Sequence, residues 1–167
     1  MNRVILQVLA VCALAVAAAV PAAAEPMRIE AVLAPKEQMR LDFEDGSKHF
    51  VLLVRREGKA EGSGPLVGAA VTEYGMHDIV PGVAGDPHGY LEFTQPGGDK
   101  AYIKWTVRAI FVANPGGKSK LLGYGHWELA GGTGTFAGMK GVGTLQIKPA
   151  GKTERRFILQ GDLVPAP

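Results

Sequence analysis

The sequence predicts an all-β fold, with seven or eight antiparallel strands in one domain. Segments such as Ala101–Ala113 alternate apolar and polar side chains with a period of two, and they are rich in β-branched and aromatic residues, as half-buried strands are. Glycine-rich turns separate these segments at short intervals, which is typical of β-sandwiches and β-barrels. No segment after residue 47 shows the apolar period of an amphipathic helix.

The N-terminus has the layout of a secretory signal. Arg3 precedes the apolar run Val4–Val20, and the small residues Ala22–Ala24 follow it. A transmembrane anchor is the alternative interpretation, but the apolar run is only about 17 residues long and a cleavage site follows it. We therefore expect residues 1–24 to be a cleaved signal peptide, and we expect the mature protein to be periplasmic or secreted.

We expect the remaining chain to divide into an N-terminal segment with a possible first strand, residues 25–47, and a β-barrel domain, residues 48–167. Within the first segment only Met39–Glu44 alternates apolar and charged residues as a half-buried strand does, and Asp45-Gly46 then predicts a turn. The strands expected in the domain are His49–Arg56, Leu66–Val80 with a bulge at Gly75, Gly89–Thr94, Ala101–Ala113, Lys120–Ala130, Phe136–Lys148 and Glu154–Val164.

Charge and cysteine content exclude several classes of function. Without the signal the chain has 167 − 24 = 143 residues. It contains 18 − 1 = 17 cationic and 16 acidic residues, which give a net charge of +1. This balance argues against nucleic-acid binding, which requires a clustered basic face. Cys12 lies in the signal, so the mature chain has no cysteine for a nucleophile, an iron–sulfur cluster or a thiolate zinc site.

One motif, Gly132–Ala137, matches the G-x-G-x-x-A form of the dinucleotide-binding fingerprint. That fingerprint requires a helix directly after the turn, with its N-terminus facing the pyrophosphate. Such a helix would contain Gly138, Gly141 and Gly143, and each costs about 1 kcal/mol relative to alanine in a helix. We therefore interpret the segment as a β-hairpin, whose first glycines form the turn and whose later ones relieve crowding on a strongly coiled strand.

The run Ala130–Thr144, AGGTGTFAGMKGVGT, resembles the GGTGxFxGaxGxG hairpin of the allene oxide cyclase and dirigent-like proteins, a hairpin also found in many exported bacterial proteins. The resemblance implies a single antiparallel, calycin-like β-barrel of about eight strands with a mostly apolar cavity. It also implies homo-oligomers and hydrophobic small-molecule ligands. No catalytic residue of either enzyme family aligns with a position of this chain, so the resemblance identifies no active site.

Two groups of side chains are candidates for chemistry. Glu73 and His77 share one face of a predicted strand, and a carboxylate beside an imidazole can transfer protons to a bound molecule. The alternatives are that this face points outward or that Glu73 pairs with a cation across the sheet. His126 and Glu128 also share a face, but no third ligand lies at metal-site spacing, so we expect rim residues, no metal and no cofactor.

The two tryptophans lie on the apolar faces of their strands. In a barrel Trp105 and Trp127 would either fill the core or form the wall of a pocket. We therefore assign Glu73, His77, Trp105 and Trp127 as candidate ligand-binding residues, and we assign no catalytic residue.

The function expected from the sequence is the binding of a small hydrophobic molecule inside the barrel. One alternative is a protein-interaction or inhibitor module that acts through the loop Pro81–Gly89, and another, by analogy of fold, is an isomerase or cyclase. A solvent-reached cavity would favour the binder, and a plugged barrel with an exposed apolar loop would favour the interaction module. We expect no nucleic-acid partner and, after signal cleavage, no membrane association; half-apolar outer faces are compatible with a homo-oligomer.

Overall fold

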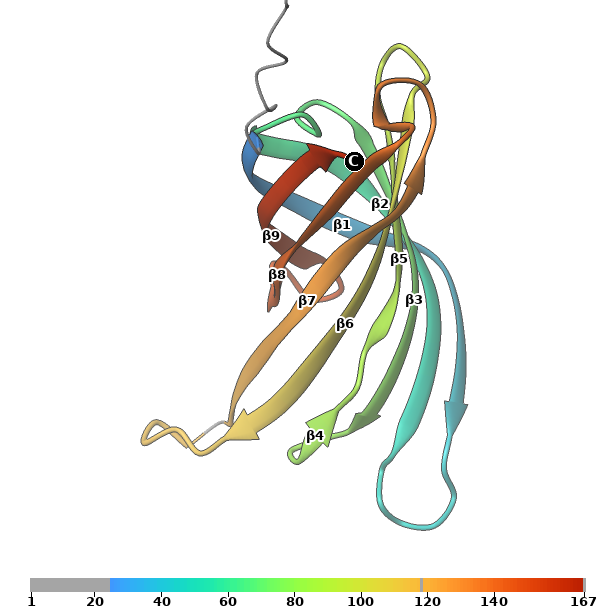
Figure 1. The fold of residues 1–167 in the computed structure, drawn as a ribbon. Coiled ribbons are helices and arrows are strands. Elements are labelled where there is room, and N and C mark those ends of the chain that lie inside the picture. Colours follow the sequence, from blue (N-terminus) through green and yellow to red (C-terminus); the bar gives the residue numbers. More distant parts are fainter. Residues whose placement is uncertain (1–24, 118, 167) are drawn as a thin grey trace, which may run out of the picture.

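The computed structural model describes residues 25–117 and 119–166, which form a closed antiparallel β-barrel of eight strands with one short additional strand (Figure 1). The predicted all-β barrel is therefore confirmed, while the predicted signal peptide lies outside the described residues. Among the described residues, no helix is long and apolar enough to cross a membrane. The strands are β1 (Glu25–Asp42), β2 (Phe50–Ser63), β3 (Ala70–Val80), β4 (Ala84–Gly85), β5 (His88–Thr94), β6 (Lys100–Val112), β7 (Lys120–Gly132), β8 (Met139–Pro149) and β9 (Arg155–Pro165).

The strands follow one another around the barrel in the order β2-β1-β9-β8-β7-β6-β5-β3, and β3 pairs with β2 to close it. Every pairing is antiparallel, and most neighbours in the barrel are neighbours in the sequence. The short strand β4 lies between the ends of β3 and β6, because Gly85 pairs with both Ile79 and Ala109. Closure removes the free sheet edges wherever the pairing is complete.

Strand β1 corrects the expected division of the chain at residue 47. Met27, Ile29, Ala31 and Leu33 are buried at alternate positions, and the strand pairs with both β2 and β9. Residues 25–42 are therefore part of the barrel wall rather than a segment that precedes it. The alternation begins in the sequence at Met27, but the apolar run Ala31–Ala34, in which Val32 is exposed, makes it less visible than in the later strands.

A β-bulge explains why the second half of β1 is not half-buried as expected. The register of β1 against β2 shifts between Pro35 and Glu37, which reverses the faces of the residues that follow. Met39 and Leu41 consequently point outward and are 69% and 61% exposed. The guanidinium of Arg40 lies instead 3.7 Å from the centre of the Phe50 ring, in a cation–π contact.

The barrel has a closed half and an open half. The pairing of β1 with β9 stops at Leu33, and the pairing of β7 with β8 covers only Tyr124–Glu128. Beyond these points Figure 1 shows β6 and β7 on one side, and β1, β2 and β3 on the other, continuing past the tip of the β8–β9 hairpin. The wall is therefore incomplete over this part of the barrel.

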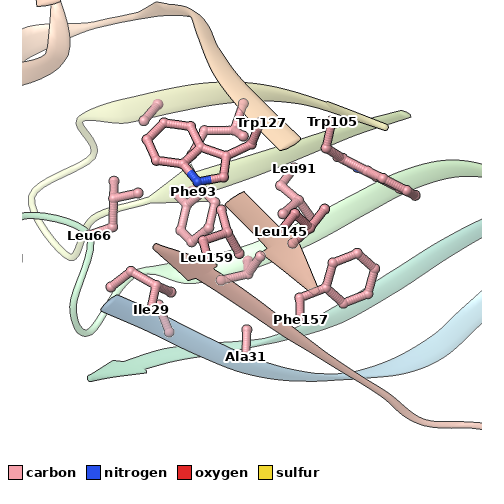
Figure 2. Packing of buried hydrophobic residues seen from close by; sticks show 14 of the residues in the cluster. Ile29, Ala31, Leu66, Leu91, Phe93, Trp105, Trp127, Leu145, Phe157 and Leu159 are labelled. Carbon is pink, nitrogen blue, oxygen red and sulfur yellow. The ribbon is translucent and has the colours of Figure 1, made fainter. Parts of the chain in front are cut away.

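The closed half is filled by apolar side chains. Figure 2 shows Leu66 and Ile29 at one end of this core and Trp105 and Phe157 at the other. Phe136, from the 3-10 turn Gly134–Phe136, is also buried in it. This end of the barrel is therefore packed with apolar side chains.

The glycine-rich segment is a hairpin, as the sequence predicts. A 3-10 turn of three residues, Gly134–Phe136, lies within the Gly132–Ala137 motif, and β8 begins two residues after the motif at Met139, so no helix N-terminus is available for a pyrophosphate. Gly134 and Gly138 have φ values of +53° and +70°, which favour glycine. A Cβ atom at Gly138 would meet no neighbour, so the turn conformation, rather than the expected crowding, requires this glycine.

Crowding does explain three other glycines, which surround Trp127. A Cβ at Gly143 would lie 2.5 Å from Trp127 Nε1, and a Cβ at Gly161 would lie 2.7 Å from its Cζ2. A Cβ at Gly141 would lie 3.3 Å from its Cζ3. The ring is completely buried between β8 and β9, and its Nε1 donates a hydrogen bond to the carbonyl oxygen of Gln160 at 3.2 Å.

We predict that Gly143→Ala destabilises the barrel by roughly 1–3 kcal/mol, the usual cost of overpacking a close-packed core. The added methyl group would collide with the carbonyl oxygen of Gln160 and with Trp127. Gly131→Ala in β7 is the matched control, because no heavy atom lies within 4 Å of its would-be Cβ. Urea unfolding followed by tryptophan fluorescence measures both changes. Equal effects of the two substitutions would contradict the proposed role of Gly143.

Candidate functional site

The open half of the barrel contains a cavity of about 290 Å³. Its wall is mainly apolar and comes from strands on opposite sides of the barrel. The apolar lining residues include Phe50, Leu52, Ile79, Val107, Ala109, Phe111, Leu121 and Ile147. Pro81 and Pro87, at the two ends of the loop that contains β4, also line it. The incomplete wall beside β8 and β9 leaves the cavity open to solvent.

A buried polar cluster lies at the inner end of this cavity. Arg56 on β2 donates from Nη1 to Glu73 Oε2 on β3 at 2.7 Å, and His77 Nε2 lies 2.9 Å from Glu73 Oε1. Arg56, Glu73 and His77 are 4%, 0% and 8% exposed. Arg56 and His77 line the cavity, whereas Glu73 lies behind them. The structure therefore confirms that Glu73 pairs with a cation across the sheet, one of the two alternatives weighed from the sequence.

The imidazole of His77 can take part in two hydrogen-bonding arrangements. Its Nε2 lies 3.1 Å from Arg56 Nη1 as well as 2.9 Å from Glu73 Oε1. With a proton on Nε2 the ring donates to Glu73, and without that proton it accepts from Arg56. The tautomer of His77 therefore decides which of the two buried partners its Nε2 bonds.

Gly75 allows Glu73 and His77 to meet. Residues four apart on a strand are normally well separated, at about 3.3 Å per residue. Gly75 lies between them on the same inward face, and a Cβ there would collide with the Glu73 carboxylate and lie 2.9 Å from His77 Nε2. The bulge expected at Gly75 is wrong, because its pairing with Val54 and Gly89 continues without a register shift.

A second arginine lies close to the cluster. Arg155, the first residue of β9, lines the cavity, and its Nη1 donates to the carbonyl oxygen of Glu154 at 2.8 Å. Among residues 25–117 and 119–166 it has no carboxylate within ion-pair distance. Burial lowers the pKa of Arg155, and the positive charge of Arg56 lowers it further, while the carboxylates of Glu73 and Glu154 oppose the shift.

The structure brings three of the four candidate residues together and places the fourth elsewhere. The rings of His77 and Trp105 are 5.9 Å apart, and the Trp105 ring meets Phe157 edge-on at 5.6 Å. Trp105 therefore separates the polar cluster from the packed core. Trp127 does not line the cavity, since it is enclosed by the glycines of β8 and β9 in the closed half.

Arg56 and Arg155 are functional candidates that the sequence analysis missed. Each occurs in phase with inward apolar residues of its own strand: Arg56 with Leu52 and Val54, and Arg155 with Phe157 and Leu159. A cation on the inward phase of a strand is the signal that could have identified both. Each also has a neighbouring arginine, Arg55 or Arg156, on the outward phase, which obscured the pattern.

The other candidates from the sequence lie outside the cavity. His126 and Glu128 are exposed on the outer face of β7, as expected of rim residues, and Glu128 Oε1 lies 3.4 Å from Lys104 Nζ. A wider groove of about 620 Å³ crosses the outer face around Met39, Leu53 and Tyr74. This groove is a shallow surface hollow without a buried polar group, so it resembles a small-molecule site less than the cavity in the open half does.

Comparison with known proteins gives no family assignment: no protein-family model matches the chain, and no curated protein is detectably similar to it. The resemblance of the glycine hairpin to the allene oxide cyclase and dirigent-like barrels therefore stays a prediction. The features of the molecule that bear on its function are the cavity and the residues at its inner end.

We predict that Glu73→Leu destabilises the protein by about 3–5 kcal/mol, because it leaves the buried guanidinium of Arg56 without its carboxylate. The double substitution Arg56→Met and Glu73→Leu should recover most of this loss, since an apolar pair of similar size leaves no buried charge. Chemical unfolding of the two single variants and the double variant gives the coupling energy. Strictly additive effects would show that the pair is not coupled.

Proposed function

We propose that this protein binds a small, largely apolar molecule in the open half of its β-barrel. The observation that carries the proposal is the cavity of about 290 Å³, which is walled by apolar side chains and open on the side of the β8–β9 hairpin. Burial of apolar ligand surface against such a wall contributes about 25 cal/mol per Å² removed from water. Concave apolar sites with a few converging polar groups are the usual form of a ligand pocket.

The size of the cavity favours a compact ligand. Pockets for drug-sized molecules span roughly 300–1,000 Å³, so a volume of about 290 Å³ lies at the lower limit of that range. One or two fused rings, or a short branched chain, match this space better than a long acyl chain. The polar cluster of Arg56, Glu73 and His77 at the inner end would orient such a molecule.

The loop Pro81–Gly89 supports this proposal more than the protein-interaction alternative. Its central residues Ala84 and Gly85 pair with β3 and β6, and Pro81 and Pro87 line the cavity. Val83 is exposed, but it is a single apolar side chain rather than a patch. We therefore assign the loop to the mouth of the cavity.

An isomerase or cyclase activity is a second candidate function, and the position of His77 favours it. The imidazole lines the cavity and contacts Glu73, so it has a carboxylate with which it can exchange or share a proton. General acid–base catalysis requires such a group within hydrogen-bonding reach of the bound substrate. His77→Gln, which removes the titratable group at similar size, would abolish a proton-transfer activity while leaving ligand affinity largely intact.

We predict that Ala109→Phe removes ligand binding by filling the cavity with a phenyl ring. Ala109 faces the cavity on β6, and the next residue, Ile110, points outward and is exposed. Ile110→Phe is therefore a control with the same introduced side chain on the opposite face. Binding is measured by the fluorescence of the neutral apolar probe N-phenyl-1-naphthylamine, with unfolding curves recorded for both variants. Unchanged probe affinity in a folded Ala109→Phe protein would contradict the proposal.

Native mass spectrometry of protein purified from its own source, without refolding, tests the same proposal. A co-purifying small molecule, lost in the Ala109→Phe protein, is the expected result. Trp105 lies beside His77, and if it supports the cavity in this way, Trp105→Ala should lose the co-purifying molecule to a greater extent than its lowered free energy of unfolding explains. A captured protein in place of a small molecule would favour the interaction module.

A further inference from the structure

We infer that the cavity recognises a carboxylic acid: a compact apolar molecule whose carboxylate lies at the inner end, against Arg56 and Arg155. This inference rests on the proposed function, because it names the chemical class of the molecule bound in the same cavity. It follows from the sign of the charges that line the cavity, from their incomplete pairing, and from buried donors without acceptors.

The charged groups in the cavity wall are all cationic. Arg56, Lys148 and Arg155 line it, and no aspartate or glutamate does. Lys148 is exposed at the rim, whereas Arg56 is almost completely buried and Arg155 half-buried. Buried cations in an apolar wall attract anions much more strongly than exposed ones, because water does not screen them.

Glu73 neutralises only one of the two guanidiniums at the inner end. Its carboxylate accepts a hydrogen bond from Arg56 at 2.7 Å, while Arg155 has only the backbone carbonyl of Glu154 as an acceptor. The group of Arg56, Glu73 and Arg155 therefore carries a net charge of 1 − 1 + 1 = +1. The two positive charges repel each other, and this repulsion contributes to the lowered pKa of Arg155. A monoanion balances this charge, whereas a dianion would leave an uncompensated negative charge in an apolar site.

Two buried N–H groups add to the argument. Arg56 Nε and Trp105 Nε1 are buried and have no hydrogen-bond partner among the described residues. A buried donor without an acceptor is unfavourable, and more so when it belongs to a charged group. Arg56 lines the cavity itself, so an acceptor at its inner end can reach this guanidinium. A carboxylate has two oxygens with about four acceptor positions, and it forms its strongest hydrogen bonds with guanidinium groups.

A matched pair of two-ring compounds tests the inference. Naphthalene-2-carboxylate and naphthalene-2-carboxamide have nearly the same shape but differ in charge, and their affinities are measured by isothermal titration calorimetry at neutral pH. We expect the carboxylate to bind at least tenfold more tightly than the carboxamide. Equal affinities of the two compounds would overturn the inference.

Two neighbouring arginines provide the variants. Arg155→Met should reduce the preference for the carboxylate to less than threefold. We expect this variant to fold, because Arg155 forms no ion pair within the described part of the chain and its loss leaves no carboxylate there without a partner. Arg156→Met is the control, since Arg156 points outward, where its Nη1 donates to Glu30 at 2.9 Å, and the preference should persist. A preference that survives Arg155→Met undiminished would overturn the assignment of the carboxylate to this position.

The neutral probe separates failure of this inference from failure of the proposed function. If N-phenyl-1-naphthylamine binds to the wild-type protein and both naphthalene compounds displace it equally, the cavity is a ligand site but does not select acids. If neither the probe nor either naphthalene compound binds, the proposed function and the inference are both overturned. Displacement by the carboxylate alone supports both.

Discussion

The short β8–β9 hairpin is the constraint on which the rest of the structure depends. β8 ends at Pro149 and β9 begins at Arg155, while β6, β7 and β1–β3 continue further along the barrel. In the half that the hairpin covers, the barrel is closed and filled by tryptophan, phenylalanine and aliphatic side chains. In the half that it leaves uncovered, apolar inward faces line a cavity. Because the hairpin ends before the strands on either side of it, the barrel is divided into a core and a site.

The β8–β9 hairpin can close its half of the barrel because glycines in β8 and β9 allow the backbones of both strands to approach Trp127 closely. Gly141 and Gly143 on β8 and Gly161 on β9 present no side chain to the ring, so the indole lies directly against both strands. The large aromatic side chain on β7 therefore replaces the side chains that the glycines lack. Glycine acts in the same way at the site, where Gly75 leaves the space in which Glu73 and His77 meet.

Much of the barrel could be predicted from the sequence because strand alternation is a local property. The segment Ala101–Ala113 shows it clearly and corresponds to β6 within one residue at each end. The first strand was placed too late, because the continuous apolar run Ala31–Ala34 obscures the alternation that starts at Met27. The faces of Met39 and Leu41 depend on a bulge at Pro35, and a one-residue shift of register has no local signal that decides it.

The site was less predictable, because its pairs join residues of different strands. That Glu73 and His77 share a face follows from their spacing, but the partner of Glu73 follows from the register of β2 against β3, in which Arg56 lies opposite it. The contribution of Arg155 requires closure of the whole sheet, since β9 reaches the cavity only around the barrel through β1 and β8. Sequence patterns assign residues to faces, and the closed sheet decides which faces meet.

The polar cluster is better explained as a source of selectivity than as a source of stability. A buried ion pair contributes little net stability, because the cost of removing both charges from water offsets their attraction. An apolar pair at Arg56 and Glu73 would satisfy the requirements of folding equally well. The chain instead places a second guanidinium, Arg155, beside a pair that is already neutral, and burial disfavours that additional charge. An excess, half-buried cation next to an apolar wall is unfavourable for the empty barrel and favourable for a complex with an apolar anion.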